Sequence, residues 1–96
     1  MSDDDFTAIN HLPAVLGHVE IEAKRYVGCD IRDLVGRATV AFNEIEDIHD
    51  EVTDRSIGDV DRAKRMHSAC FELAALLAAQ LAMIEVQHPE ILDDAQ

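Results

Sequence analysis

Hydrophobic residues recur at steps of three and four along most of the chain, the spacing that places side chains on one face of an α-helix. Pro13 suits the first turn of a helix, because the N–H that proline lacks would have no intrahelical partner there. Gly28 fits the position that ends a helix. The sequence therefore predicts a first helix from about residue 12 to residue 28, with an apolar stripe formed by Leu12, Val15, Leu16, Val19, Ala23 and Tyr26.

A second stripe begins directly after Asp30, whose side chain suits an N-cap, with Asp33 near the positive end of the helix dipole. It predicts a helix of about 25 residues, roughly 37 Å long. Gly36 is discordant, because glycine inside a helix costs about 1 kcal/mol relative to alanine, and it indicates a bend or a close contact. The stripe is formed by Ile31, Leu34, Ala38, Ala41, Ile45, Ile48 and Val52.

A third helix is predicted from about Val60 to Gln87. Gly58 breaks the preceding pattern, Ser56 or Asp59 can cap the new helix, and the proline at position 89 ends it. The short connection predicts an antiparallel hairpin of the second and third helices, with the first helix laid across it. We therefore expect an all-α fold in which residues 11–96 form one domain and residues 1–10 form a flexible acidic arm.

Between positions 73 and 86 the third helix is apolar on almost every side. We expect the rest of the chain to cover one face and a second copy to cover another, so that two hairpins pair into a four-helix core as a homodimer. The face expected to be covered carries Leu73, Leu77, Leu81 and Ile84, the other carries Leu76, Ala79 and Met83, and all seven residues are assigned to the oligomer interface.

The chain has 96 residues and a formal net charge of −12, which disfavours direct binding to nucleic acids and to anionic membranes. Cys29 and Cys70 are too few for a disulfide scaffold and lack zinc-site spacing, so a reducing cytoplasm is expected. The first residues are acidic where a signal peptide would be basic. The apolar run from Leu73 to Ile84 is shorter than a membrane span, so no membrane segment is expected.

The spacing Glu46-x-x-His49 resembles the Glu-x-x-His motif of ferritin-like di-iron proteins. His67 is the third residue placed near it by the predicted hairpin, and Cys70 lies one turn further on. Glu46, His49 and His67 therefore form an alternative iron or zinc site. His49 also falls within the apolar stripe, so a histidine in the hydrophobic core is the simpler interpretation, and no cofactor is expected.

A second pair, Glu85 and His88, has the same spacing. Together with the chain length, the two pairs resemble the encapsulated ferritins, and the resemblance implies a lone carboxylate, which Glu20 or Glu22 of the first helix would supply. The segment between the two pairs departs from that family's pattern, so no residue is carried over.

Catalytic motifs are not evident: no serine lies in a G-x-S-x-G context, and the four glycines are scattered rather than gathered in a phosphate-binding loop. A non-enzyme is expected. Between positions 44 and 61 there are eight acidic residues and one basic residue. This run either keeps the chain soluble or recognises a basic protein surface. The residues predicted to bind such a partner are Glu44, Glu46, Asp47, Asp50, Glu51 and Asp54.

The expected function is that of a small cytoplasmic regulator or inhibitor that sequesters a protein partner. In one version the acidic helices imitate a nucleic-acid backbone and block a nucleic-acid-binding protein, such as a transcription or defence factor. In the other version the second apolar face of the third helix replaces the partner's own dimer contact. Strong salt dependence is expected of the first version and weak salt dependence of the second.

Overall fold

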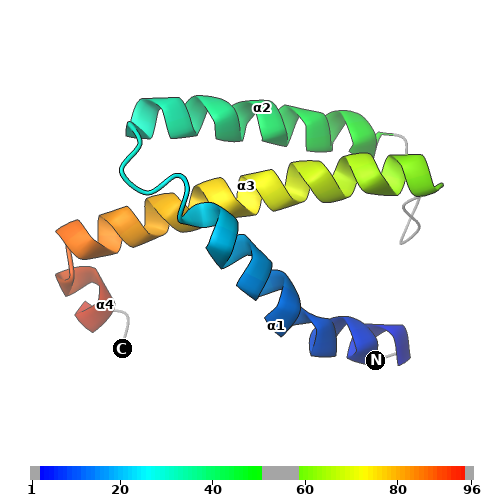
Figure 1. Ribbon diagram of the computed structural model, residues 1–96, viewed down its shortest axis with the longest axis horizontal. Helices are drawn as coiled ribbons and strands as arrows, with labels where there is room; N and C mark the ends of the chain where they lie inside the picture. Colours follow the sequence, from blue (N-terminus) through cyan, green and yellow to red (C-terminus); the bar gives the residue numbers. More distant parts are fainter. Residues whose placement is uncertain (1–2, 51–58, 95–96) are drawn as a thin grey trace.

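The computed structural model describes residues 3–50 and 59–94. Its four helices are α1 (Asp3–Ala23), α2 (Ile31–His49), α3 (Val60–Gln87) and α4 (Glu90–Asp94) (Figure 1). No strand occurs within the described ranges, and the predicted all-α class is confirmed. The connection between α2 and α3 lies outside the described residues, and so does Val52, to which the sequence predicted that α2 extends.

Aspartates begin both long helices, Asp30 as predicted and Asp59 as one of the two residues that the sequence offered. Asp30 caps α2, since its Oδ1 accepts a hydrogen bond of 2.7 Å from the N–H of Arg32. Asp59 caps α3 in the same way, with a bond of 2.9 Å from the N–H of Arg62. At its other end α3 stops before Pro89, and the short helix α4, which the sequence did not predict, follows that proline.

The ends of α1 differ from the prediction. The helix begins at Asp3 rather than near Pro13, and its first turn carries three aspartates, which the positive end of the helix dipole favours. Pro13 lies inside the helix, where it removes one backbone hydrogen bond and favours a kink. The first turns of α1 run at an angle to the rest in Figure 1. The flexibility expected for residues 1–10 stays a prediction.

Gly28 belongs to the turn between α1 and α2. The helix ends at Ala23, five residues earlier than predicted, and residues 24–28 form a turn. Gly28 has a φ of 93°, in the left-handed region that glycine enters without steric cost. Its N–H donates to the sulfur of Met83 at 3.4 Å, so the turn is attached to α3.

α3 is the central element. α2 lies alongside it and runs in the opposite direction, α1 crosses it obliquely, and α4 packs at its end (Figure 1). Within the described ranges α1 and α2 do not pack against each other. The radius of gyration is 15.6 Å, whereas a compact chain of this length has about 12.5 Å. The chain by itself is therefore an open arrangement of helices.

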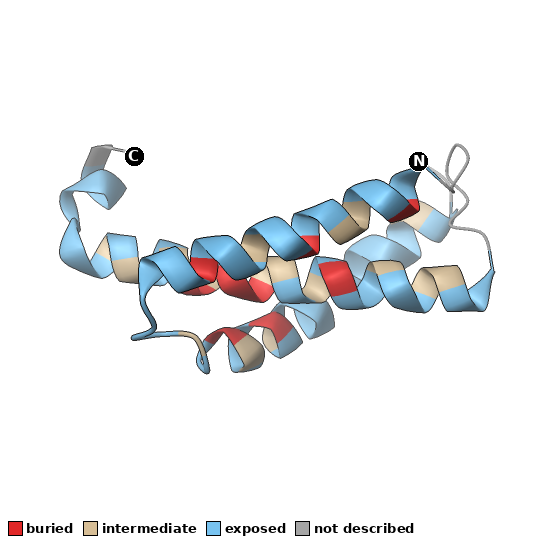
Figure 2. Cartoon of the chain, turned by 90° about the horizontal axis from the view of Figure 1, so that it is seen from above, coloured by how far each residue is buried: buried red, intermediate tan, exposed pale blue. Residues whose placement is uncertain are grey.

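The buried residues form two thin layers on either side of α3 (Figure 2). Val19 and Ala23 of α1 pack on Ala75 and Ala79, with Tyr26 and Phe71 at the edge of this cluster. A second set of buried residues lies between α2 and α3. The buried residues there are Leu34, Ala41 and Ile48 of α2 and Ala69 and Leu76 of α3.

The two apolar faces of α3 are exchanged relative to the prediction. Leu76 and Ala79, which we expected to await a partner, are fully buried within the chain. Leu77, Leu81 and Ile84, which we expected the chain to cover, are exposed. The reason is that α1 packs on Ala75 and Ala79 and α2 packs on the side of α3 that carries Ala69 and Leu76, which leaves Leu77 on the outer side.

By length and composition α3 is also the one helix among the described residues that could cross a membrane. An 18-residue window within it has a mean hydropathy of 1.7, and 22% of that window is buried inside the structure. The core helix of a soluble protein meets the same criterion, so this finding is weak support for a membrane span.

Candidate interaction surface

Of the residues predicted to bind a basic partner, those that the structure describes lie toward one end of the α2–α3 pair. Glu46, Asp47 and Asp50 are exposed in and after the last turns of α2. Asp59 and Asp61, which are also exposed, lie at the start of the antiparallel α3 and therefore at the same end (Figure 1). Glu51 and Asp54 lie outside the described residues. The described part of this acidic surface thus includes acids from both helices.

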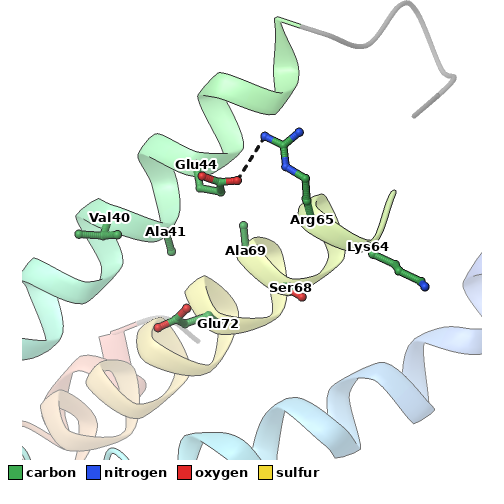
Figure 3. Close-up of a pocket in the computed structure, with 8 residues that line it drawn as sticks. All are labelled: Val40, Ala41, Glu44, Lys64, Arg65, Ser68, Ala69 and Glu72. Atoms are coloured by element: carbon green, nitrogen blue, oxygen red, sulfur yellow. Dashed lines mark hydrogen bonds and ion pairs between the residues drawn. The ribbon is translucent and has the colours of Figure 1, made fainter. Parts of the chain in front are cut away.

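Glu44 differs from its neighbours. Its Oε1 lies 3.5 Å from Nη2 of Arg65, and the side chain is half-buried between the two helices. Figure 3 shows Arg65 reaching toward Glu44, while Lys64 points away from α2. Glu44 therefore joins α2 to α3 and contributes less to the acidic surface than the prediction assumed.

The position of the acids in α2 does not favour that helix. Asp47 lies in the last turn and Asp50 is the C-cap residue. The carbonyl groups at this end carry partial negative charge, and a carboxylate there is unfavourable by about 0.3–1 kcal/mol. Helix stability therefore does not explain Asp47 or Asp50. It does explain Asp59 and Asp61, which lie at the start of α3, where negative charge is favourable.

The alternative metal site is not assembled within the described residues, where no three histidine, cysteine, aspartate or glutamate side chains lie close enough to hold an ion. His49 is not in the core, as the stripe suggested, but 78% exposed, with Nδ1 at 3.9 Å from Asp50. Because Ile48 faces α3, the next residue points about 100° away from it. His67 stacks on Phe71 instead, with ring centroids 6.3 Å apart.

In the second Glu-x-x-His pair, Glu85 and His88, the histidine contacts a different carboxylate. Nδ1 of His88 lies 3.0 Å from Oε1 of Glu90, across the proline that separates α3 from α4. The amino-terminal backbone of α4 and this histidine both donate hydrogen bonds to the Glu90 carboxylate, and they lower its pKa. The contact between His88 and Glu90 therefore stabilises the junction of α3 and α4 locally.

A surface that the sequence analysis did not identify as a unit lies on one side of the α2–α3 pair. Four of its seven members directly follow a residue that is buried in the structure: Val35, Phe42, Cys70 and Leu77 follow Leu34, Ala41, Ala69 and Leu76. The other three lie on the same side at helical spacing. One residue is a rotation of about 100°. In antiparallel helices the same rotation from the contact leads to the same side of the pair. We call this the apolar face, and its exposed members are Ile31, Val35 and Phe42 of α2 and Cys70, Leu77, Leu81 and Ile84 of α3.

The sequence did contain a signal for the part of this face on α2. Apolar residues occur at alternating steps of four and three from Ile31 to Ile45, which is the spacing of a helix–helix seam. This pattern is separate from the stripe that faces α3. The two patterns share Ile31, Ala38 and Ile45, so the sequence alone shows them as one broad stripe.

On the opposite side of the pair, α2 and α3 form a shallow groove of about 440 Å³ (Figure 3). Ala41 and Ala69 form part of its lining, and Glu44, Lys64 and Arg65 place charges along it. Val40, which is 70% exposed, belongs to this side. The two sides of the α2–α3 pair therefore differ, since large exposed apolar side chains gather on one side and charged side chains line the groove on the other.

Comparison with known proteins shows no match to this chain among protein-family models, curated proteins or solved structures.

Proposed function

We propose that the protein is a non-catalytic protein-interaction module, whose acidic surface binds a basic surface of a partner protein. The observation that carries the proposal is the position of Asp47 and Asp50, both exposed at the end of α2 where they weaken that helix. Charged groups that do not serve the fold are candidates for recognition. A concentrated acidic field speeds association with a cationic surface and selects among partners.

The finer architecture belongs to the same proposal. α2 and α3 act as one antiparallel hairpin, and two hairpins pair into a helical bundle, so the working unit is a homodimer. Its two acidic ends would then engage two copies of a partner or two basic sites on one partner. Bivalent engagement strengthens binding without new contacts when both sites can be reached at once.

Affinity capture tests the proposal. Tagged protein is compared with a variant in which Glu46→Gln, Asp47→Asn and Asp50→Asn remove three charges. The matched control is Asp3→Asn, Asp4→Asn and Asp5→Asn, which removes the same charge from α1. We expect wild type and control to retain the same basic protein at 50 mM salt and to release it at 300 mM. The triple variant at positions 46, 47 and 50 should retain none. Equal retention by all three proteins would refute the acidic surface as the binding site.

A further inference from the structure

We infer that the apolar face of α2 and α3 is the contact between two copies of this chain. The inference rests on the proposed dimer and specifies its interface, which differs from the one expected from the sequence. Leu76 and Ala79 are taken out of the contact, since the chain buries them itself. Phe42 and Val35 of α2 are brought into it.

The exposed area of the chain fits one such partner. The accessible surface is 7342 Å², whereas a compact monomer of this mass exposes about 5,500 Å². The excess is about 1,800 Å² per chain. Obligate homodimers bury roughly 1,000–2,500 Å² per subunit, so a single two-fold contact accounts for the excess.

The chemistry of the face suits a second copy. Its exposed members include no charged side chain, and Phe42 and Leu81 are 50% and 61% exposed. Two antiparallel helices that share one apolar side pair with an identical set about a two-fold axis and form a four-helix core. The exposed members of this face offer a basic partner no counter-charge, whereas an identical set of apolar side chains is complementary to them.

The salt dependence of binding distinguishes this contact from the acidic surface. Two chains of net charge −12 repel each other, so salt should strengthen their association by screening the repulsion. The acidic surface should instead bind a basic partner less well in salt. The two surfaces therefore respond to ionic strength in opposite directions.

The substitution test measures the dimer dissociation constant by sedimentation equilibrium of detergent-free protein, over a concentration series from 1 μM to 100 μM. Leu77→Asp and Phe42→Asp each place a charge on the apolar face and should raise the dimer dissociation constant by about a hundredfold or more. Val40→Asp places the same charge on the opposite side of α2 and should leave it unchanged. Circular dichroism of each variant reports whether the helices persist.

Thiol labelling tests the same contact in the unaltered chain. Cys70 lies on the apolar face and Cys29 lies in the turn before α2, and both thiols are exposed in the single chain. We expect iodoacetamide to label Cys29 at every concentration and Cys70 ever more slowly as the dimer forms. This readout stands even where an aspartate variant fails to fold.

The outcomes are distinct. Dimers that persist in Leu77→Asp, with Cys70 labelled as fast as Cys29, would overturn the inference and leave the proposed dimer to another surface. A monomer at every concentration would overturn both the inference and the proposed dimer. A monomer that binds neutral phosphatidylcholine vesicles through α3, with Cys70 protected only by the vesicles, would assign the face to lipid and overturn the inference.

Discussion

Nη2 of Arg65 lies 3.5 Å from Oε1 of Glu44, so an ion pair joins α3 to α2 beside the groove (Figure 3). Both side chains are about half exposed, and water screens the attraction. We expect Glu44→Gln to lower the free energy of unfolding by about 0.2–1 kcal/mol at low salt and by less in 1 M NaCl. Urea denaturation measures the effect, with Glu46→Gln as the exposed control. A loss that is unchanged in high salt would argue against an ionic origin.

Leu76 tests the core. It is fully buried, so Leu76→Ala should lower the free energy of unfolding by about 2–5 kcal/mol through lost burial and the cavity that remains. Val40→Ala, at an exposed position in α2, should change it by no more than about 0.5 kcal/mol. Both are measured by urea denaturation at one protein concentration, because association contributes to stability. Equal effects at the two positions would contradict the assignment of Leu76 to the core.

Two glycines should respond to alanine with opposite signs. Gly28→Ala forces a Cβ into the left-handed region and should destabilise the fold by about 1–2 kcal/mol. Gly36 lies inside α2, and a Cβ there would meet nothing within 4 Å, so the close contact suggested by its position is absent. Gly36→Ala should therefore stabilise the fold by about 0.5–1 kcal/mol. Thermal unfolding of both variants checks the signs, and a loss at Gly36 would contradict the open surroundings.

Asp47 and Asp50 should destabilise α2. Asp47→Asn and Asp50→Asn each remove a negative charge from the carbonyl end of the helix and should raise the free energy of unfolding by about 0.3–1 kcal/mol at low ionic strength. Asp33→Asn, at the opposite end of the same helix, should lower it. Urea titrations at 20 mM and 500 mM salt measure the three changes. The dipole explanation fails if the Asp47 and Asp33 variants shift in the same direction.

The junction of α3 and α4 should weaken in acid. Hydrogen bonds from the start of α4 and from His88 lower the pKa of Glu90 below its ordinary value. The stabilisation is therefore present above the ordinary pKa of a glutamate and is lost as the pH falls through the lowered one. Carboxyl NMR titration of Glu90 should give a midpoint below that of the same residue in an unfolded peptide. In His88→Ala the midpoint should rise, and an unchanged midpoint would show that the histidine is not involved.

Local sequence signals accounted for the starts of the two long helices α2 and α3 and for the end of α3. Asp30 and Asp59 cap α2 and α3, and Pro89 ends α3, because an aspartate oxygen satisfies the first N–H groups and a residue before proline leaves the helical region. The all-α class followed from hydrophobic spacing alone. The same reasoning misplaced the start of α1, since Pro13 was read as a beginning although a helix can continue past a proline with a bend.

The sequence by itself thus determined that the chain forms three main helices, because helical spacing depends on neighbours along the chain, and it determined how acidic the chain is. Tertiary structure alone decided that Leu76 is buried and Leu77 exposed, and that His49 points to solvent. Both leucines belong to stripes with a helical period, and the period does not distinguish between them. The choice is made by where α1 and α2 pack on α3, which are contacts between residues far apart in the chain.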